Sequence, residues 1–340
     1  MELSEVEGGA RESRRAARHS PEDMSEGDQT TRSPNRAGGA SPWADWTPPE
    51  GENTADRDLA LDAHLHTDQS PDSSVPIDVY AALAVERGIP EIAITDHVDF
   101  DPRDPAFEYS RYEDRERVVR GAAERWAREG VVIRFGAELT YNTRWEDDVR
   151  AHLRRYRYDY VIGSVHDWPE SPYWPDRVRT WVTGRSLEEV LQPYYAEVIA
   201  AARTGLFDTI GHLDVVRRYL HPHITFEHLA ERPELQEPAL EAIIESNVSL
   251  DVNSSGFRYP GGETYPSRAV VARYRELGGE RIVVGSDAHS RGSFAHRLGE
   301  AYGHLAAAGF EALTFRRGGD PVRIQVSGGT HETTPDALPA

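Results

Sequence analysis

Two histidines, His64 and His66, alternate with apolar residues at the end of an apolar run. Side chains at positions i and i+2 of an extended strand lie on one face, so both imidazoles can point at one metal ion. Imidazole is a good ligand for Zn, Mn, Fe and related divalent ions. An HxH pair alone is weak evidence, because a strand can carry two histidines for no chemical reason. The pair therefore gains meaning only if other segments supply further ligands.

Further potential ligands follow other short apolar runs, and each is a His, Glu or Asp. They are His97, Glu138, His166, His212, Asp287 and His289. The two carboxylates, Glu138 and Asp287, are the candidates to bridge cations, and the imidazoles would fill the remaining coordination positions. Two or three ions held close together can bind a phosphate, lower the pKa of a bridging water and stabilise a leaving oxygen. The pattern predicts a metallohydrolase.

The composition narrows the possible chemistry. The chain of 340 residues has no cysteine, so disulfides and thiolate metal sites are both excluded. It also has no lysine, which excludes Schiff-base catalysis and a carbamylated lysine as a metal bridge. No GxSxG motif is present, so a covalent acyl mechanism has little support. Any metal must be held by nitrogen and oxygen ligands.

The charge and hydropathy of the chain bear on its partners. The sequence has 58 acidic against 38 basic residues and a formal charge of -20, which disfavours nucleic acid as a main partner. No apolar run is long enough for a membrane span, and the N-terminus lacks the apolar core of a signal peptide. We expect a cytoplasmic protein, and the sequence does not reveal its oligomeric state.

Short apolar runs alternate with amphipathic segments along most of the chain. Strands are predicted at 60–64, 91–95, 131–137, 158–163, 209–211, 248–252 and 281–285. Helices are predicted at 77–87, 111–128, 187–204, 238–246, 267–277 and 294–307, with a further strand at 322–326. This alternation implies an α/β fold with a parallel sheet of seven strands, closed or nearly closed into a barrel. In such barrels functional side chains gather at the C-terminal ends of the strands, where the potential ligands lie.

The chain divides into three parts by composition. Residues 1–56 are rich in Arg, Glu, Ser, Gly and Pro, so we expect a disordered tail. Residues 57–327 form a single predicted domain, and 328–340 a flexible C-terminal tail.

Six motifs occur in the order HxHT, TDHxDFD, GAE, GSVH, GHLD and GSDAH. Together they resemble the PHP (polymerase and histidinol phosphatase) family of metal-dependent phosphoesterases over roughly residues 58 to 327. The resemblance implies a distorted (β/α)7 barrel with a trinuclear metal site. It assigns His64, His66, Glu138 and Asp287 to one ion, Glu138, His166 and His212 to a second, and His97 with His289 to a third.

One position departs from the commoner family pattern. Many members have a histidine six residues after the second motif-one histidine, and this chain has Asp72 there. Carboxylate is a good ligand for Mn or Fe, so we predict a ligand. The alternative is an Asx-turn residue in a polar loop. Asp96 and Asp214 are predicted to orient His97 and His212, or to cap helices.

Residues 250–267 resemble the histidinol-phosphatase branch of the family. Within them, Arg258 is predicted to bind a terminal phosphate through two parallel hydrogen bonds. Arg217 and Arg218, which follow the GHLD motif, are further candidates, and of these Arg218 is the one we assign to the substrate.

The resemblance favours hydrolysis of a phosphomonoester, with L-histidinol phosphate as the best single substrate. A metal-bound hydroxide would attack phosphorus, and Glu138, Asp287 and His289 are expected to be essential for turnover. The required cofactors are two or three divalent ions (Zn, Mn or Fe). One alternative is a phosphatase or phosphodiesterase acting on another small phosphorylated substrate. A more distant one is a non-catalytic regulatory domain that binds metal.

Overall fold

The computed structural model describes residues 59–166, 175–230, 232–317 and 320–326. The tails predicted at 1–56 and 328–340 lie outside these residues. Within the described ranges, no helix combines the length and the apolar character needed to cross a bilayer.

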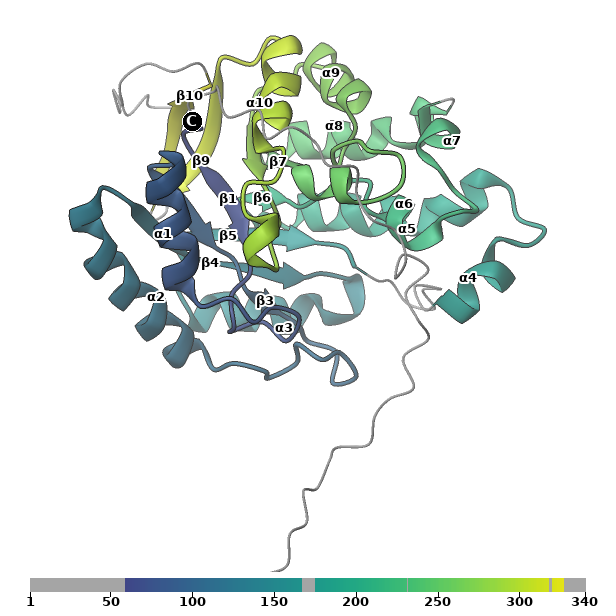
Figure 1. The fold of residues 1–340 in the computed structure, drawn as a ribbon. Helices are drawn as coiled ribbons and strands as arrows, with labels where there is room; N and C mark the ends of the chain where they lie inside the picture. Colours follow the sequence, from purple (N-terminus) through teal and green to yellow (C-terminus); the bar gives the residue numbers. More distant parts are fainter. Residues whose placement is uncertain (1–58, 167–174, 231, 318–319, 327–340) are drawn as a thin grey trace, which may run out of the picture. The chain divides into compact units, whose positions relative to one another are not determined.

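The centre of the molecule is a parallel sheet whose strands follow each other in the order β1-β2-β4-β5-β6-β7-β8, with the short β3 paired to β4 (Figure 1). The strands are β1 (Asp62–Leu65), β2 (Glu91–Ile94), β3 (His97–Val98), β4 (Val132–Thr140), β5 (Tyr160–Ser164), β6 (Thr209–Ile210), β7 (Ser249–Asn253) and β8 (Ile282–Gly285). Strands of a parallel sheet are buried on both faces, which explains apolar runs such as that of β8. The predicted seven-stranded α/β barrel is confirmed.

The first and last strands of this order, β1 and β8, meet and close the barrel at its C-terminal end. Leu65 forms a parallel bridge with Ala288, just beyond β8. The His66 N–H donates to the Ala288 carbonyl at 3.0 Å, and the Asp287 N–H donates to the His64 carbonyl at 2.8 Å. The backbone segments that carry predicted ligands therefore form the closing seam of the barrel.

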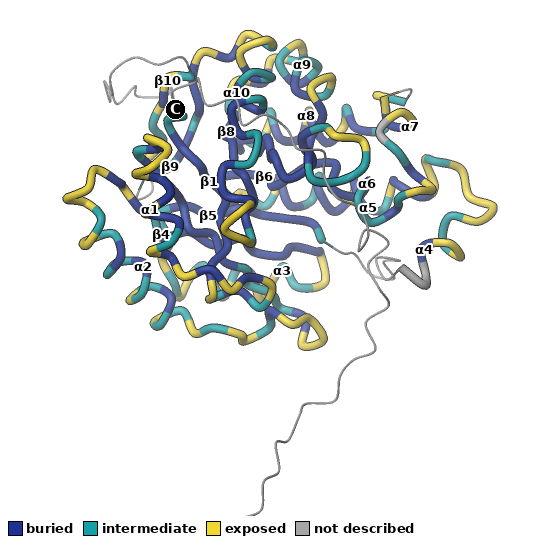
Figure 2. Tube along the Cα trace, in the orientation of Figure 1, coloured by how far each residue is buried: buried dark blue, intermediate teal, exposed yellow. Residues whose placement is uncertain are grey.

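The helices lie around the strands, with their exposed faces turned to solvent (Figure 2). They are α1 (Ile77–Arg87), α2 (Tyr112–Trp126), α3 (Glu146–Arg155), α4 (Pro175–Val182), α5 (Leu187–Arg203), α6 (Val216–Leu220), α7 (Phe226–Ala230), α8 (Glu237–Glu245), α9 (Arg268–Glu276) and α10 (Leu298–Ala307). The bounds of α1 match the prediction because its buried residues recur with helical spacing and Gly88 ends it in a left-handed conformation, φ 67°. The helices α3, α4, α6 and α7 were not predicted.

A hairpin of β9 (Ala312–Arg317) and β10 (Asp320–Gln325) lies at the opposite, N-terminal end of the barrel. Its Arg317 forms an ion pair with Glu91, the first residue of β2. Phe315 packs on Tyr160, the first residue of β5, with ring centroids 4.6 Å apart. The predicted strand at 322–326 corresponds to β10, and its partner β9 was not predicted.

Candidate metal centre

All nine predicted metal ligands gather at the C-terminal end of the barrel. His64 lies in β1, His97 begins β3, and Glu138 lies in β4. The others follow strands: His66 and Asp72 follow β1, His166 follows β5, His212 follows β6, and Asp287 and His289 follow β8. Their nitrogen and oxygen atoms form four overlapping groups, each with all potential ligand atoms within 4.8 Å of one another.

Glu138 lies at the centre of the cluster, and its two oxygens face different imidazoles. Its Oε2 atom is 3.3 Å from the Nε2 atoms of both His64 and His66, and 3.0 Å from His97 Nδ1. Its Oε1 atom is 2.9 Å from His212 Nε2 and 3.3 Å from His166 Nε2. The pairing of β3 with β4, which sets His97 opposite Glu138, helps to fix this arrangement. A carboxylate with one oxygen in each of two nitrogen-rich groups has the geometry of a bridging ligand.

Asp287 provides the second buried carboxylate. Its Oδ1 atom is 3.3 Å from His66 Nε2 and 3.4 Å from His289 Nδ1. The residue has a left-handed backbone, φ 51°, which is uncommon for a residue with a side chain. The hydrogen bond from its N–H to the His64 carbonyl holds this conformation at the seam.

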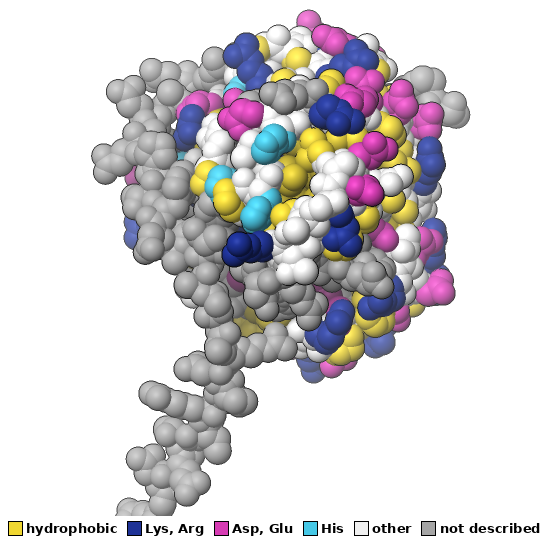
Figure 3. Space-filling model, turned by 90° about the vertical axis from the view of Figure 1, so that its right-hand side faces the viewer, with side chains coloured by type: hydrophobic (Ala, Val, Ile, Leu, Met, Phe, Trp, Pro, Cys, Tyr) yellow, Lys and Arg dark blue, Asp and Glu magenta, His cyan; other side chains and the backbone are white. Residues whose placement is uncertain are grey.

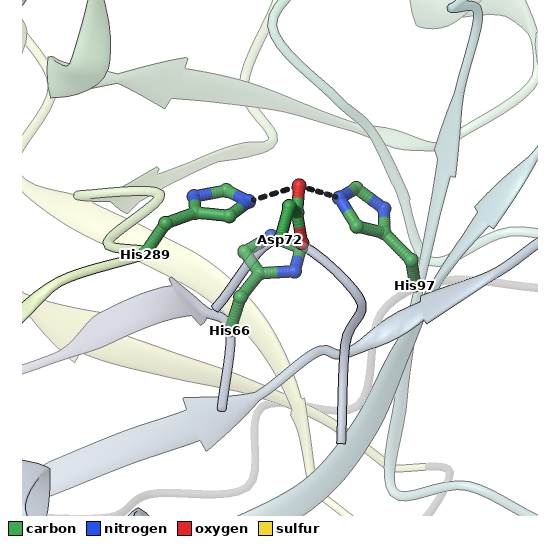
Figure 4. Close-up of side chains that lie close together, drawn as sticks. All are labelled: His66, Asp72, His97 and His289. Carbon is green, nitrogen blue, oxygen red and sulfur yellow. Dashed lines mark ion pairs between the residues drawn. The ribbon is translucent and has the colours of Figure 1, made fainter. Parts of the chain in front are cut away.

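The predicted ligand Asp72 reaches the cluster from the loop after β1. Its Oδ2 atom is 3.1 Å from His289 Nε2 and 3.3 Å from His97 Nε2, and His66 completes the group (Figure 4). The Asp72 side chain is 50% exposed, whereas those of His64 and His66 are fully buried. The cluster therefore has a buried inner part and an outer part that opens to solvent.

The charges in the inner part are strongly coupled. Burial alone would raise the pKa of Glu138, but the imidazoles of His64, His97 and His166 hold it well below its usual range. The pKa of Asp287 is also held well below its usual range, because His64, His66 and His289 outweigh burial. Burial, together with His289 and His97, lowers the pKa of His66 well below its usual value. The neighbouring carboxylates outweigh burial at His64 and His97 and raise the pKa of both well above the usual value. Neutral imidazoles and ionised carboxylates are the forms that bind metal.

The donor set fits divalent metal ions. The Nε2 atoms of His64 and His66 are buried and have no hydrogen-bond partner, although each points into the cluster. A buried nitrogen left without a partner is costly unless another ligand, such as a metal, takes its lone pair. Nitrogen and oxygen donors of this kind suit Zn, Mn and Fe.

Four residues that contact the imidazoles were not predicted from the sequence. Asp251 Oδ2 is 3.1 Å and Asn253 Nδ2 3.4 Å from His64 Nδ1. Thr140 Oγ1 is 3.1 Å from His166 Nδ1, and Ser70 Oγ is 3.4 Å from His66 Nδ1. The available signal was strand alternation, which places Asp251 and Asn253 on one face of β7. That signal does not reveal which residue of another strand lies opposite.

Asp96 and Asp214, which were predicted to orient histidines or to cap helices, have other side-chain partners. Asp96 accepts a hydrogen bond from Thr67 Oγ1 at 2.9 Å and one from Ser70 Oγ at 3.2 Å, so it connects the segments that follow β1 and β2. Asp214 forms an ion pair with Arg217, with Oδ2 3.0 Å from Nε. Both side chains are buried where they have these partners.

The predicted phosphate-binding arginines lie beside the cluster in different environments. Arg258, at the end of the short helix Ser254–Arg258 (η4), donates to the carbonyls of Ser286 and Asp287 at 2.9 and 2.8 Å. Arg218 stacks on the Tyr259 ring, with its guanidinium carbon 4.2 Å from the centroid. In the described part of the chain, Arg218 has no carboxylate within ion-pair distance. Both guanidiniums retain N–H groups for another acceptor.

Figure 3 shows the side chains on one face of the molecule. On the described part of this face, basic and acidic side chains are interspersed and histidines reach the surface. The described residues visible on this face form no continuous basic field of the kind that follows a nucleic-acid backbone.

A parallel barrel that gathers imidazoles and buried carboxylates at the C-terminal ends of its strands is a metal-binding α/β barrel. The family model of the PHP domain matches residues 62–255. The chain therefore belongs to the PHP domain family, and divalent metal ions are its cofactors.

Similar proteins span most of the chain. It is 31% identical over 258 residues to the probable histidinol-phosphatase of Deinococcus radiodurans, covering 75% of this chain and 96% of that protein. It is 26% identical to the histidinol-phosphatase of Lactococcus lactis, covering 67% of this chain and 84% of that protein. The same fold occurs in the crystal structure of the Lactococcus lactis histidinol phosphate phosphatase, complexed with zinc, L-histidinol and phosphate, with a TM-score of 0.64. The two chains are 22% identical, and the match covers 77% of this chain and 98% of that one.

Proposed function

We propose that this protein hydrolyses L-histidinol phosphate to L-histidinol and phosphate at the cluster around Glu138. The observation that carries the proposal is the position of Glu138, whose two oxygens lie between separate groups of imidazoles. Relatives named as histidinol-phosphatases match this chain over nearly their whole length, which supports the choice of substrate.

The four overlapping groups of ligand atoms support a site for two or three divalent ions. Bound there, such ions supply Lewis acidity toward a phosphoryl oxygen and lower the pKa of water. Zinc is bound in the Lactococcus lactis relative, and the donors of this chain suit Zn, Mn or Fe alike. The carboxylate at Asp72 favours the harder ions at the outer part of the cluster more than a histidine would.

The residues of the chain have distinct roles in this proposal. Glu138 and Asp287 hold the inner part of the cluster together, and His289 with Asp72 forms its solvent-facing part. Arg218 provides a guanidinium that forms no ion pair with a carboxylate among the described residues, so it can bind the phosphate dianion of the substrate. Arg258 supports the backbone of Asp287 through two N–H groups and can direct the remaining ones to the same phosphate.

The test is phosphate release by the metal-reconstituted protein from L-histidinol phosphate, beside p-nitrophenyl phosphate and a phosphodiester. Selective turnover of L-histidinol phosphate is expected. Glu138→Ala and Asp287→Ala should abolish it, and a variant that keeps near-normal activity with full metal occupancy would refute the assigned roles. Arg218→Ala should raise KM for the phosphomonoester and leave the metal content close to that of the wild type.

A second candidate is hydrolysis of another small phosphorylated substrate. It is favoured by a relative from Shewanella halifaxensis, named only a probable phosphatase, that is 24% identical over 71% of this chain. Activity on p-nitrophenyl phosphate without preference for L-histidinol phosphate would select this candidate. Full metal occupancy without turnover of any ester would instead indicate a regulatory metal-binding domain.

A further inference from the structure

We propose that Asp251, which is not among the potential metal ligands, is a positioning residue for His64. Its carboxylate would fix the imidazole in the form that carries a proton on Nδ1 and leaves Nε2 free to bind metal. This inference rests on the metal centre in the proposed function.

The geometry joins two strands across the barrel. Asp251 lies in the middle of β7, is 1% exposed, and places Oδ2 3.1 Å from Nδ1 of the fully buried His64. The other ring nitrogen of His64, Nε2, is 3.3 Å from Glu138 Oε2 and has no hydrogen-bond partner. The imidazole therefore lies between a carboxylate outside the cluster and the carboxylate at its centre.

The chemistry of the two groups determines where the proton lies. A neutral imidazole has one N–H donor and one lone pair, and an ionised carboxylate only accepts. In the neutral form of His64, which is the form that binds metal, the hydrogen bond to Asp251 therefore requires the N–H on Nδ1, and the lone pair lies on Nε2, inside the cluster. A carboxylate behind a metal-binding histidine also increases the basicity of the coordinating nitrogen.

The position of Asp251 is itself fixed. The Asn253 Nδ2 atom, on the same face of β7, donates to the same Asp251 oxygen at 3.2 Å. The Asn253 backbone pairs with Tyr265, with N–H to carbonyl distances of 2.8 and 2.9 Å in the two directions. Asn253 Nδ2 also lies 3.4 Å from His64 Nδ1, farther than Asp251 Oδ2 at 3.1 Å, so Asn253 holds the carboxylate beside the ring and Asp251 is the nearer partner of Nδ1.

The other imidazoles of the cluster have different partners. The Nδ1 atoms of His66 and His166 face the hydroxyls of Ser70 and Thr140, which are neutral groups and not carboxylates. Among the described residues, Asp251 is the carboxylate that contacts a predicted ligand without being in any of the four ligand groups.

A purely structural role explains Asp251 poorly. Its second oxygen, Oδ1, is buried and has no hydrogen-bond partner among the described residues. A buried carboxylate that is only partly satisfied is costly for the fold, and an amide of the same shape would avoid the buried charge. The carboxylate is better explained by its action on His64.

The test compares Asp251→Asn with the wild type in two measurements that need no substrate. Zinc affinity is measured by competition with a chromophoric chelator, and the stability of the metal-free protein by urea unfolding in the presence of a chelator. We expect zinc affinity to fall by about 10- to 100-fold in the variant. The urea midpoint of the metal-free variant should be equal to that of the wild type or higher.

Asp208→Asn is the matched control, because Asp208 lies just before β6 at the opposite end of the barrel and pairs with Arg316 at 2.7 Å. Its zinc affinity should stay within about twofold of the wild type, as for a substitution remote from the site. Unchanged zinc affinity in Asp251→Asn, or a loss that Asp208→Asn shows equally, would overturn the inference.

A measurement on the wild-type protein covers the case in which Asp251→Asn does not fold. Nitrogen–proton correlation spectra of the zinc-loaded protein, assigned by comparison with His64→Gln, report which nitrogen of His64 carries the proton. A protected Nδ1–H is expected, and metal binding through Nδ1 would refute the proposal. None of these measurements uses L-histidinol phosphate, so failure of the substrate assignment would leave this inference intact. A wild type that binds no zinc would overturn it.

Discussion

Gly285, the last residue of β8, lies directly against β1 where the barrel closes, and replacing it with alanine should damage both the fold and the site. A Cβ atom at this position would lie 2.3 Å from His64 Cβ, 3.0 Å from His64 N and 3.2 Å from His64 Cα. Two of these atoms belong to the backbone, so no rotamer change relieves the clash. The strands must separate by more than an ångström to restore ordinary contact of roughly 3.5–4.0 Å.

The expected cost follows from this separation. Overpacking of a rigid core costs about 1–3 kcal/mol. Separation of β1 from β8 also weakens the hydrogen bonds from Asp287 N to the His64 carbonyl and from Ser286 N to Asp62 Oδ1, both 2.8 Å long. With about 0.5–1.5 kcal/mol for each bond, the loss in the free energy of unfolding is roughly 2–6 kcal/mol. His64 is the displaced residue, so metal affinity should fall as well.

Urea unfolding of the metal-free protein and zinc competition measure the two effects. Gly292→Ala is the matched control, because a Cβ there meets nothing within 4 Å and the position has no left-handed backbone. If Gly285→Ala unfolds within about 0.5 kcal/mol of Gly292→Ala, the ordinary range for a harmless substitution, the reasoning about the seam is wrong.

Three further outcomes are expected. Tyr302→Phe should lower the free energy of unfolding by about 1–3 kcal/mol in urea titrations. The reason is that the buried Tyr302 hydroxyl accepts from Leu61 N at 3.0 Å and donates to the Leu61 carbonyl at 2.8 Å. An unchanged urea midpoint would contradict this. Burial would raise the pKa of Asp159, but hydrogen bonds from Arg120 and from Phe135 N hold it below its ordinary value of 3.8. The stabilising contribution of ionised Asp159 is therefore complete above pH 3.8 and is lost as the pH falls through the lower, folded-state value. The difference in melting temperature between the wild type and Asp159→Asn should accordingly be constant at neutral pH and shrink in acid; a constant difference down to pH 2 would count against it. Chelation should lower the melting temperature, and free metal at about 100 times its Kd should restore about 2.7 kcal/mol; a melting temperature that does not depend on metal would argue against a folded-state site.

The sequence was most informative where a pattern is local. The helix at 77–87 was predicted with the bounds of α1, because its apolar spacing and its terminal glycine both lie within a few residues. The parallel seven-stranded barrel also followed from the alternation of apolar runs with amphipathic segments. Short elements such as β3 were not predicted, because two residues carry no periodic signal.

In the candidate site, the metal ligands were predicted from the sequence and their hydrogen-bond partners were not. Every predicted ligand except Asp72 lies in or follows an apolar run, and the barrel brings all nine to one end. The partners of those ligands depend on which strands face each other, and a residue such as Asp251 has no local feature that shows it lies opposite His64. The two carbonyls that accept from Arg258 were equally invisible, because any backbone carbonyl can accept and only the folded chain selects one.

The closing seam has a consequence for how this protein is made. The Asp62 carboxylate and the Ser286 N–H that it accepts from are 224 positions apart in the chain. A ribosome releases the N-terminal strand first, so His64 and His66 leave the exit tunnel long before Asp287 and His289. For most of translation the nascent chain contains only some of the metal ligands, and β1 lacks β8, its neighbour at the closing seam. Any divalent ion taken up early would bind an incomplete set, and selection of the final metal becomes an event of the finished chain.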